Sequence, residues 1–194
     1  NLLKGVFGYG FKYPSDIQSR TIHIINSGHD LIAQSQSGSG KTGAFVIGSL
    51  SNIDVTKRYP QVLILANTRI LADQIMKVAQ NISMYMNIDV SLCVGGGTGG
   101  NKYNAHGQLK SSHVLIGTPG RICEMLSNNI FDGERIRTFI MDESDALLKE
   151  DFRPEIIEII SKMGRNTQIC IFSATYAKET LETTENFLRN PYRI

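Results

Sequence analysis

The chain has 194 residues, of which 41 % are hydrophobic and 20 % are charged, and its formal net charge is +2. This length and composition are typical of one globular domain and exclude intrinsically disordered and collagen-like proteins. The net charge is too small to indicate nucleic-acid binding by itself. No apolar run approaches the about 20 residues of a membrane span, and no N-terminal apolar segment resembles a secretory signal.

Short apolar runs alternate along the chain with longer helical patterns. The runs predicted as strands are Asp30–Ala33, Val62–Ala66, Val90–Val94, Val114–Gly117, Thr138–Met141 and Ile169–Phe172. The clearest helical patterns are Ile70–Met86, Pro154–Met163 and Ala177–Leu188. Several runs are apolar throughout, as expected of parallel strands covered on both faces. The alternation therefore predicts an α/β fold with a doubly wound, mostly parallel sheet flanked by helices.

Polar or glycine-rich segments follow the predicted strands. They are Gln34–Thr42, Asn67–Ala72, Gly95–Gly100, Thr118–Arg121, Asp142–Asp145 and Ser173–Thr175. In a doubly wound sheet, ligands bind at the carboxyl ends of the strands. The sequence therefore predicts a binding site where these segments gather at one edge of the sheet.

The segment after the first predicted strand matches the core of a Walker A phosphate loop. Its residues are Ser37, Gly38, Ser39, Gly40, Lys41 and Thr42, and a helical pattern follows. Glycines allow successive backbone N–H groups to turn inward around phosphate oxygens. Lys41 could then reach the β- and γ-phosphates of a nucleotide, and the Thr42 hydroxyl could bind Mg²⁺. The alternative is a flexible surface loop, and Ser35 stands where the usual pattern begins with Gly.

Two carboxylates, Asp142 and Glu143, follow the fifth predicted strand at the same edge. An acid at this place is the Walker B arrangement, in which Asp142 holds Mg²⁺ and Glu143 orients or deprotonates the attacking water. The alternative is that both residues only cap a helix that begins near Ala146. Together, the two motifs predict a nucleoside triphosphatase with Lys41, Asp142 and Glu143 as catalytic residues and Mg²⁺ as a cofactor, without identifying the nucleotide.

The order and spacing of seven motifs resemble the first RecA-like lobe of the DEAD-box RNA helicases over nearly the whole chain. The motifs are Gln18, Gln34–Thr42, Thr68-Arg69, Gly95-Gly96, Thr118–Arg121, Asp142–Asp145 and Ser173–Thr175. The last two look most like the translation initiation factor 4A branch. The resemblance implies a RecA-like P-loop fold and an RNA-stimulated ATPase. We therefore expect residues 1–194 to form one N-terminal helicase ATP-binding domain, without the second RecA-like lobe.

Residues 10–18 look like the Q motif of this family. By resemblance, Gln18 reads the adenine edge and Phe11 packs on the base. An amide can donate and accept at once, and an aromatic ring offers a stacking face, so these residue types suit adenine. The alternative is a helix from Ser15 to Ile25 on which Gln18 is only exposed.

The motifs after the second, third and fourth predicted strands look like the RNA-binding elements of the family. The residues concerned are Thr68, Arg69, Gly95, Gly96, Thr118, Pro119, Gly120 and Arg121. Arginine side chains and a helix N-terminus suit phosphate, and glycine allows close backbone approach. Such contacts read the RNA backbone with little sequence specificity. The alternative is a set of ordinary turns.

The resemblance also implies that the Ser173 and Thr175 hydroxyls bond to Asp145 and couple the ATP state to RNA binding. A simple strand-end turn is the alternative. Three positions depart from the family: Asn67 and Ile70 replace the usual Pro and Glu, and Ser144 replaces the usual Ala. The missing Glu puts RNA affinity in doubt, whereas Ser144 keeps both acids. The many glycines at 95–100 predict a mobile loop.

The resemblance implies that the chain is the ATP-binding lobe of an ATP-dependent RNA helicase that unwinds RNA locally in translation initiation. No arginine-finger candidate follows Thr175, so the lobe alone should hydrolyse ATP very slowly. The expected partners are RNA, the second lobe of the full-length protein and regulatory or scaffold proteins, but no membrane. A nucleotide-dependent RNA clamp or scaffold, and a DNA-directed or unrelated P-loop NTPase, are the alternatives.

The cysteines and histidines add no metal or redox site to this prediction. Cys93, Cys123 and Cys170 are far apart and odd in number, which favours a reducing, intracellular compartment. The resemblance favours the cytoplasm, with the nucleus as the alternative. The histidines show no ligand or triad spacing and are interpreted as structural: His23, His29, His106 and His113.

Overall fold

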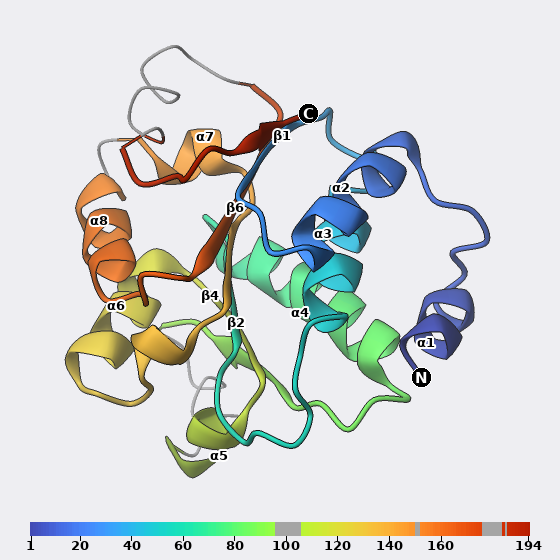
Figure 1. Cartoon of the computed structure of the whole chain (residues 1–194). Helices are drawn as coiled ribbons and strands as arrows, with labels where there is room; N and C mark the ends of the chain where they lie inside the picture. Colours follow the sequence, from blue (N-terminus) through green and yellow to red (C-terminus); the bar gives the residue numbers. More distant parts are fainter. Residues whose placement is uncertain (96–105, 150–151, 176–183, 185) are drawn as a thin grey trace.

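The computed structural model describes residues 1–95, 106–149, 152–175, 184 and 186–194. In these ranges the chain forms a parallel seven-stranded sheet with the strand order β3-β4-β2-β5-β6-β1-β7 (Figure 1). The strands are β1 Leu31–Gln34, β2 Val62–Leu65, β3 Val90–Cys93, β4 Val114–Gly117, β5 Thr138–Met141, β6 Gln168–Ser173 and β7 Tyr192–Arg193. The predicted doubly wound parallel sheet is confirmed, and the six predicted strands match β1 to β6 to within one residue at each end.

Helices cover both faces of the sheet and bury two apolar clusters. The helices are α1 Leu2–Gly8, α2 Asp16–Asn26, α3 Lys41–Leu50, α4 Arg69–Ser83, α5 His106–Ser111, α6 Pro119–Ser127, α7 Ser144–Leu147 and α8 Arg153–Ser161, with a 3₁₀ turn η1 at Gly133–Arg135. Helices α1 to α4 lie on one side of the sheet, and α6 to α8 lie on the other (Figure 1). The inner strands β2, β4 and β5 are buried throughout, which explains why their sequences are almost entirely apolar.

The predicted helix boundaries agree less closely with the structure than the predicted strand boundaries do. The pattern Ile70–Met86 corresponds to α4, which ends three residues earlier at Ser83, and Pro154–Met163 corresponds to α8. Most of the third pattern, Ala177–Leu188, falls outside the described residues. In the described part of the chain, no helix is long and apolar enough to cross a membrane.

Strand β7 was not predicted, and a buried carboxylate fixes the chain that leads to it. Asp30 directly precedes β1 and accepts hydrogen bonds from the backbone N–H of Ile169 at 2.9 Å and of Arg189 at 2.7 Å. The Arg189 guanidinium lies 3.7 Å from the same carboxylate. Because donors surround the buried charge, Asp30 joins the amino ends of β1 and β6 to the segment before β7.

His113 is a buried histidine at the opposite edge of the sheet from the predicted site. It directly precedes β4, and its Nδ1 accepts a hydrogen bond from Asp89 N at 3.0 Å, so the proton of the neutral ring lies on Nε2. Burial lowers the pKa of His113, and the nearby carboxylate of Asp89 opposes this shift only in part. The structural interpretation of this histidine agrees with its contacts.

We expect the stability of the fold to decrease as the pH falls below about 6.5, the ordinary pKa of histidine. The unfolded chain would bind a proton there, whereas folded His113 resists protonation because it is buried and because its Nδ1 already accepts a hydrogen bond. This one group contributes a slope of at most about 1.4 kcal/mol per pH unit.

Urea unfolding between pH 7.5 and 5 would measure the slope in the wild type and in His113→Asn. The Asn carbonyl oxygen can accept from Asp89 N without titrating, so the variant should show a shallower slope. The charged neighbours Asp54, Asp89 and Arg58 are unchanged in the variant and therefore cancel in the comparison. Equal slopes in the two proteins would contradict the assignment.

Candidate functional site

The phosphate-loop sequence forms a tight turn between β1 and α3, as predicted. Gly38 and Gly40 have φ angles of +80° and +99°, a region that favours glycine. The ammonium of Lys41 folds over the loop and donates hydrogen bonds to the carbonyl oxygens of Ser35 and of Gln36, the latter at 3.1 Å. Lys41 and Thr42 begin α3, so its positive N-terminal end faces the loop. This geometry is that of an anion cradle.

Ser35 replaces the glycine of the usual pattern without disturbing the turn. Its hydroxyl donates to Ser39 Oγ at 2.5 Å and thereby closes the loop across its base. Its backbone N–H donates to the carbonyl oxygen of Ser173 at the end of β6, at 3.0 Å. The loop is therefore tied to the neighbouring strand end.

Gln18 lies under the phosphate loop and is 3 % exposed, so the exposed position given in the alternative is wrong. The capped helix of that alternative is present as α2, and Gln18 takes part in its capping box with Ser15. Its amide nitrogen donates to the carbonyl oxygen of Gly40 at 3.1 Å, and its amide oxygen accepts from Ser15 N at 3.0 Å. Phe11 and Gln18 both line a largely apolar cavity of about 400 Å³ beside α1 and α2. The structure thus brings the two residues together next to the loop. Their role toward adenine stays a prediction.

Gly43 completes this contact and was not recognised in the sequence. A Cβ atom at this position would lie 2.7 Å from Gln18 Nε2 and 2.9 Å from the tip of the Phe11 ring. Glycine in the first turn of α3 therefore lets Phe11 and Gln18 approach the helix. A glycine directly after Lys-Thr is the signal that could have indicated this close packing.

Asp142 lies at the end of β5 with its side chain buried, on the same edge as the phosphate loop. Burial raises the pKa of Asp142 to about 6, and the positive charge of Lys41 acts in the opposite direction. The Asp142 carboxylate accepts a hydrogen bond from Glu143 N at 3.0 Å. A buried carboxylate next to a phosphate cradle fits a divalent cation, which would compensate its charge.

Glu143 is held in a left-handed backbone conformation with a φ angle of +50°. Such a conformation is uncommon for a residue with a side chain and occurs mainly at turns and functional sites. It ends β5 abruptly and begins the short helix α7. The half-buried Glu143 side chain thus lies directly beside Asp142.

Ser144, which replaces the usual Ala of the motif, has a buried hydroxyl with no hydrogen-bond partner in the described part of the chain. A buried polar group without a partner costs about 1–3 kcal/mol. We therefore expect Ser144→Ala to raise the free energy of unfolding by about 1 kcal/mol.

Chemical denaturation of the two proteins would measure this gain. Ser49→Ala is the matched control, because Ser49 is equally buried in α3 but its hydroxyl donates to Val46 O at 3.2 Å. The control should be neutral or destabilised. A Ser144→Ala variant that is less stable than the wild type would show that the hydroxyl has a partner.

The acidic motif contacts the segment after β6. Of the two hydroxyls expected from the resemblance to bond to Asp145, only that of Thr175 does so. Thr175 donates its hydroxyl to Asp145 Oδ2 at 2.8 Å. The prediction for Ser173 requires correction: its hydroxyl donates to the carbonyl oxygen of Thr175 at 2.6 Å. Ser173 is the last residue of β6, and its hydroxyl is directed toward the backbone of the residues that follow the strand. Since Ser173 O also accepts from Ser35 N, hydrogen bonds run from the phosphate loop to Asp145.

The predicted RNA-binding residues begin helices at the ends of β2 and β4, which are neighbours in the sheet. Thr68 caps α4, because its hydroxyl accepts from Leu71 N at 3.2 Å. Thr118 precedes α6, Pro119 begins it, and Gly120 leaves open space around its backbone. Arg121 forms an ion pair with Glu124 at 2.8 Å, a partner that the sequence analysis did not foresee.

The other predicted RNA-binding residues, and the two neighbouring positions that depart from the family, have different surroundings. Arg69 is exposed at the start of α4, and Gly95 follows β3 with no atom within 4 Å of a Cβ position. Gly96 and the rest of the glycine-rich segment fall outside the described residues. Ile70 is 73 % exposed, and the buried Oδ1 of Asn67 has no hydrogen-bond partner in the described chain.

Comparison with known proteins places this arrangement in a family. The model of the DEAD/DEAH box helicase family matches residues 15–184, which include the phosphate loop, the acidic motif and Ser173–Thr175. The chain belongs to the DEAD/DEAH box helicases. In the structure, the phosphate loop and the acidic motif lie at the same edge of the parallel sheet.

Several curated helicases resemble the whole chain. It is 44 % identical over 194 residues to the ATP-dependent RNA helicase eIF4A of Saccharomyces cerevisiae, and 40 % identical to eukaryotic initiation factor 4A of Caenorhabditis elegans. All of this chain is covered in both comparisons, but only 48 % of each relative. The chain therefore spans about half the length of the curated relatives that it matches.

Solved structures of DEAD-box proteins share the fold. A DEAD box protein from Methanococcus jannaschii matches with a TM-score of 0.91 at 27 % identity, covering 100 % of this chain and 53 % of that one. Saccharomyces cerevisiae Dbp5 bound to RNA and ADP BeF3 matches with a TM-score of 0.89 at 30 % identity, covering 100 % and 49 %. The predicted RecA-like lobe is thereby confirmed as the fold of this helicase-family chain.

Proposed function

We propose that this chain is the N-terminal, ATP-binding RecA-like lobe of an ATP-dependent RNA helicase that acts in translation initiation. The observation that carries the proposal is the meeting of the Lys41 phosphate loop with the buried Asp142 at one sheet edge. The relatives named eIF4A, which match all of this chain, support the helicase activity over a clamp or scaffold. A cytoplasmic location would follow from a role in translation.

The residues at the sheet edge fit a nucleotide triphosphate with Mg²⁺. The ammonium of Lys41 would bind the phosphates, and Thr42 and Asp142 would hold the metal, partly through water. When bound, Mg²⁺ would neutralise charge on the phosphate oxygens. Glu143, fixed beside Asp142 by the left-handed turn, would orient the attacking water. Phe11 and Gln18 would select adenine at the neighbouring apolar cavity.

RNA would lie across the ends of β2, β3 and β4, where the helix N-termini of α4 and α6 face the same edge. Helix N-termini with arginine suit the phosphates of a backbone and give little base specificity. The contact between Thr175 and Asp145 would couple this surface to the nucleotide site. Arg121 would have to leave or share its ion pair with Glu124 in order to bind phosphate.

The second RecA-like lobe of a full-length protein would supply the arginine finger, which is worth about 10³–10⁵ in rate in related enzymes. No such arginine motif follows Thr175 in this sequence. We therefore propose that residues 1–194 bind ATP or ADP but turn ATP over very slowly by themselves. RNA-stimulated turnover at the rate of an intact ATPase would contradict this.

Competition between nucleotides tests the adenine site directly. With Mg²⁺ present, the chain should bind ADP more tightly than GDP, and Gln18→Ala should lose this preference because the amide that reads the base is gone. Isothermal titration would give the affinities, and Gln74→Ala, an exposed glutamine on α4, is the control. Equal binding of ADP and GDP by the wild type would remove the adenine assignment. Absence of binding would remove the phosphate site as well.

A further inference from the structure

A groove opens at the amino ends of β2, β5 and β6, on the sheet edge opposite the phosphate loop. It consists of two adjoining cavities of about 490 and 730 Å³. Both cavities are lined by Tyr59, Glu134, Arg135 and Ser161, so they form one continuous surface. We call this surface the amino-edge groove. None of the predicted nucleotide or RNA residues lines it.

The groove carries an excess of positive charge. Its cations come from four separate parts of the fold and are Lys110, Arg135, Arg137, Lys162 and Arg165, against the two acids Asp132 and Glu134. Five positive and two negative side chains leave a charge of +3. The C-terminal ends of α6 and α8 face the groove and each contribute about half a negative charge, which leaves a net positive site.

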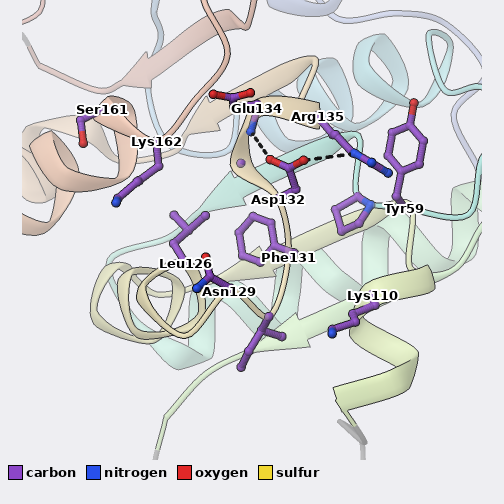
Figure 2. Close-up of a pocket in the computed structure, with 13 residues that line it drawn as sticks. Tyr59, Lys110, Leu126, Asn129, Phe131, Asp132, Glu134, Arg135, Ser161 and Lys162 are labelled. Atoms are coloured by element: carbon purple, nitrogen blue, oxygen red, sulfur yellow. Dashed lines mark hydrogen bonds and ion pairs between the residues drawn. The ribbon is translucent and has the colours of Figure 1, made fainter.

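Most of these cations are available to a ligand. Arg135 is the most engaged of them: its Nε lies 3.2 Å from Asp132 Oδ2, and its guanidinium stacks 4.9 Å from the centre of the Tyr59 ring. Figure 2 shows Arg135 between these two side chains. The other four cations form no ion pair with any acid in the described ranges, and all four are exposed. Lys162 interacts electrostatically with Glu158, and Arg137 with Asp54. Such interactions between exposed charges are weak, so these cations lose little on binding an anion.

The floor of the first cavity of the groove consists of apolar side chains. Leu126, Ile130 and Phe131 line the first cavity and are 6 %, 7 % and 6 % exposed, and Pro60 is buried beside them. Figure 2 shows Leu126 and Phe131 in the middle of the lining, with Lys110 and Lys162 on opposite sides. An apolar floor within a cationic rim suits a segment that carries both acidic and apolar side chains.

We propose that the amino-edge groove binds an acidic peptide segment of a partner protein, with an apolar side chain seated between the lysines. The positive charge of the groove is complementary to the negative charge of such a peptide. A peptide can place its carboxylates at the separate cations and its apolar residue on the floor. A nucleic acid fits less well, because Asp132 and Glu134 would repel its regular phosphates and Arg135 already covers the Tyr59 ring.

Selection from a displayed library of random peptides on the wild-type chain tests the proposal. The affinities of the selected peptides would then be measured by fluorescence anisotropy for the wild type and for Lys110→Gln/Lys162→Gln. The matched control is Lys4→Gln/Lys77→Gln, which removes the same charge from two exposed lysines outside the groove. A second variant, Arg137→Gln/Arg165→Gln, neutralises the other cavity, and thermal melts would show that each variant folds.

Selected peptides should carry net negative charge and at least one large apolar residue. Their binding should weaken at least tenfold in Lys110→Gln/Lys162→Gln, not change in the control, and weaken with added salt. Peptides that bind equally to both folded groove variants, or groove-dependent peptides that are neutral or basic, would overturn the proposal. A third outcome would also overturn it: the groove variants lose binding to a uridine oligonucleotide, and no selected peptide depends on the groove. The groove would then be an RNA-binding surface.

Discussion

The Lys41→Ala variant is expected to bind Mg²⁺-ADP about 10- to 150-fold more weakly than the wild type. A hydrogen bond to a charged group is worth about 1.5–3 kcal/mol, and every 1.4 kcal/mol is about a factor of ten in affinity. The ammonium of Lys41 already lies over the phosphate loop, where it contacts the carbonyl oxygens of Ser35 and Gln36. Bound phosphate would give this charge a better partner. Isothermal titration calorimetry would measure the change.

Lys77→Ala is the matched control for this substitution. Lys77 is an exposed lysine on α4 with an ion pair to Asp73, far from the loop in sequence and on another helix. Its removal should leave ADP affinity unchanged, since exposed ion pairs contribute little. Wild-type affinity in a folded Lys41→Ala chain would show that the loop does not cradle phosphate. The nucleotide site would then have to be sought elsewhere.

The Gly117→Ala variant is expected to lose about 3 kcal/mol of stability and to melt about 6–12 °C lower than the wild type. Gly117 is the last residue of β4 and lies opposite Cys93 of β3. A Cβ atom at this position would approach the carbonyl oxygen of Cys93 well below the 3.0 Å that Cβ atoms keep. That oxygen also accepts from Thr118 N at 3.2 Å, so the backbone cannot move away freely.

Gly120→Ala provides the control for Gly117→Ala, only three residues along the chain. No atom lies within 4 Å of a Cβ position at Gly120, which is the second residue of α6. Alanine is favoured over glycine in a helix, so this variant should be as stable as the wild type or more stable by up to about 1 kcal/mol. Urea unfolding would compare the three proteins. Equal stability of the two variants would contradict the close approach of β3 and β4.

The structure also changes how two unusual serines in the motifs are understood. The serine at position 35 stabilises the phosphate loop, because it forms hydrogen bonds with Ser39 and with the end of β6. The serine at position 144, by contrast, buries a hydroxyl without a partner among the described residues. The same residue type is therefore accommodated at one motif and costly at the other, and only the surroundings decide which.

The sequence determined the strands and the edge at which the site forms. The inner strands β2, β4 and β5 are covered on both faces, so each is a mostly apolar run that differs from the polar segments beside it. The segments that follow parallel strands must meet at one edge, so the sequence by itself predicts that the phosphate loop lies near Asp142. Strand β7 escaped prediction because its two residues are exposed and lack such a pattern.

The tertiary structure alone decided which side chains contact one another at that edge. The partners are distant in sequence: Gln18 bonds to Gly40, Asp145 to Thr175, and Ser35 to Ser173. It also directed the Ser173 hydroxyl to the carbonyl oxygen of Thr175 and not to Asp145. Apolar periodicity is local and records only which face of each element is buried. The strand order decides which strand ends become neighbours, and hydrogen bonds, which act over about 3 Å, depend on that order.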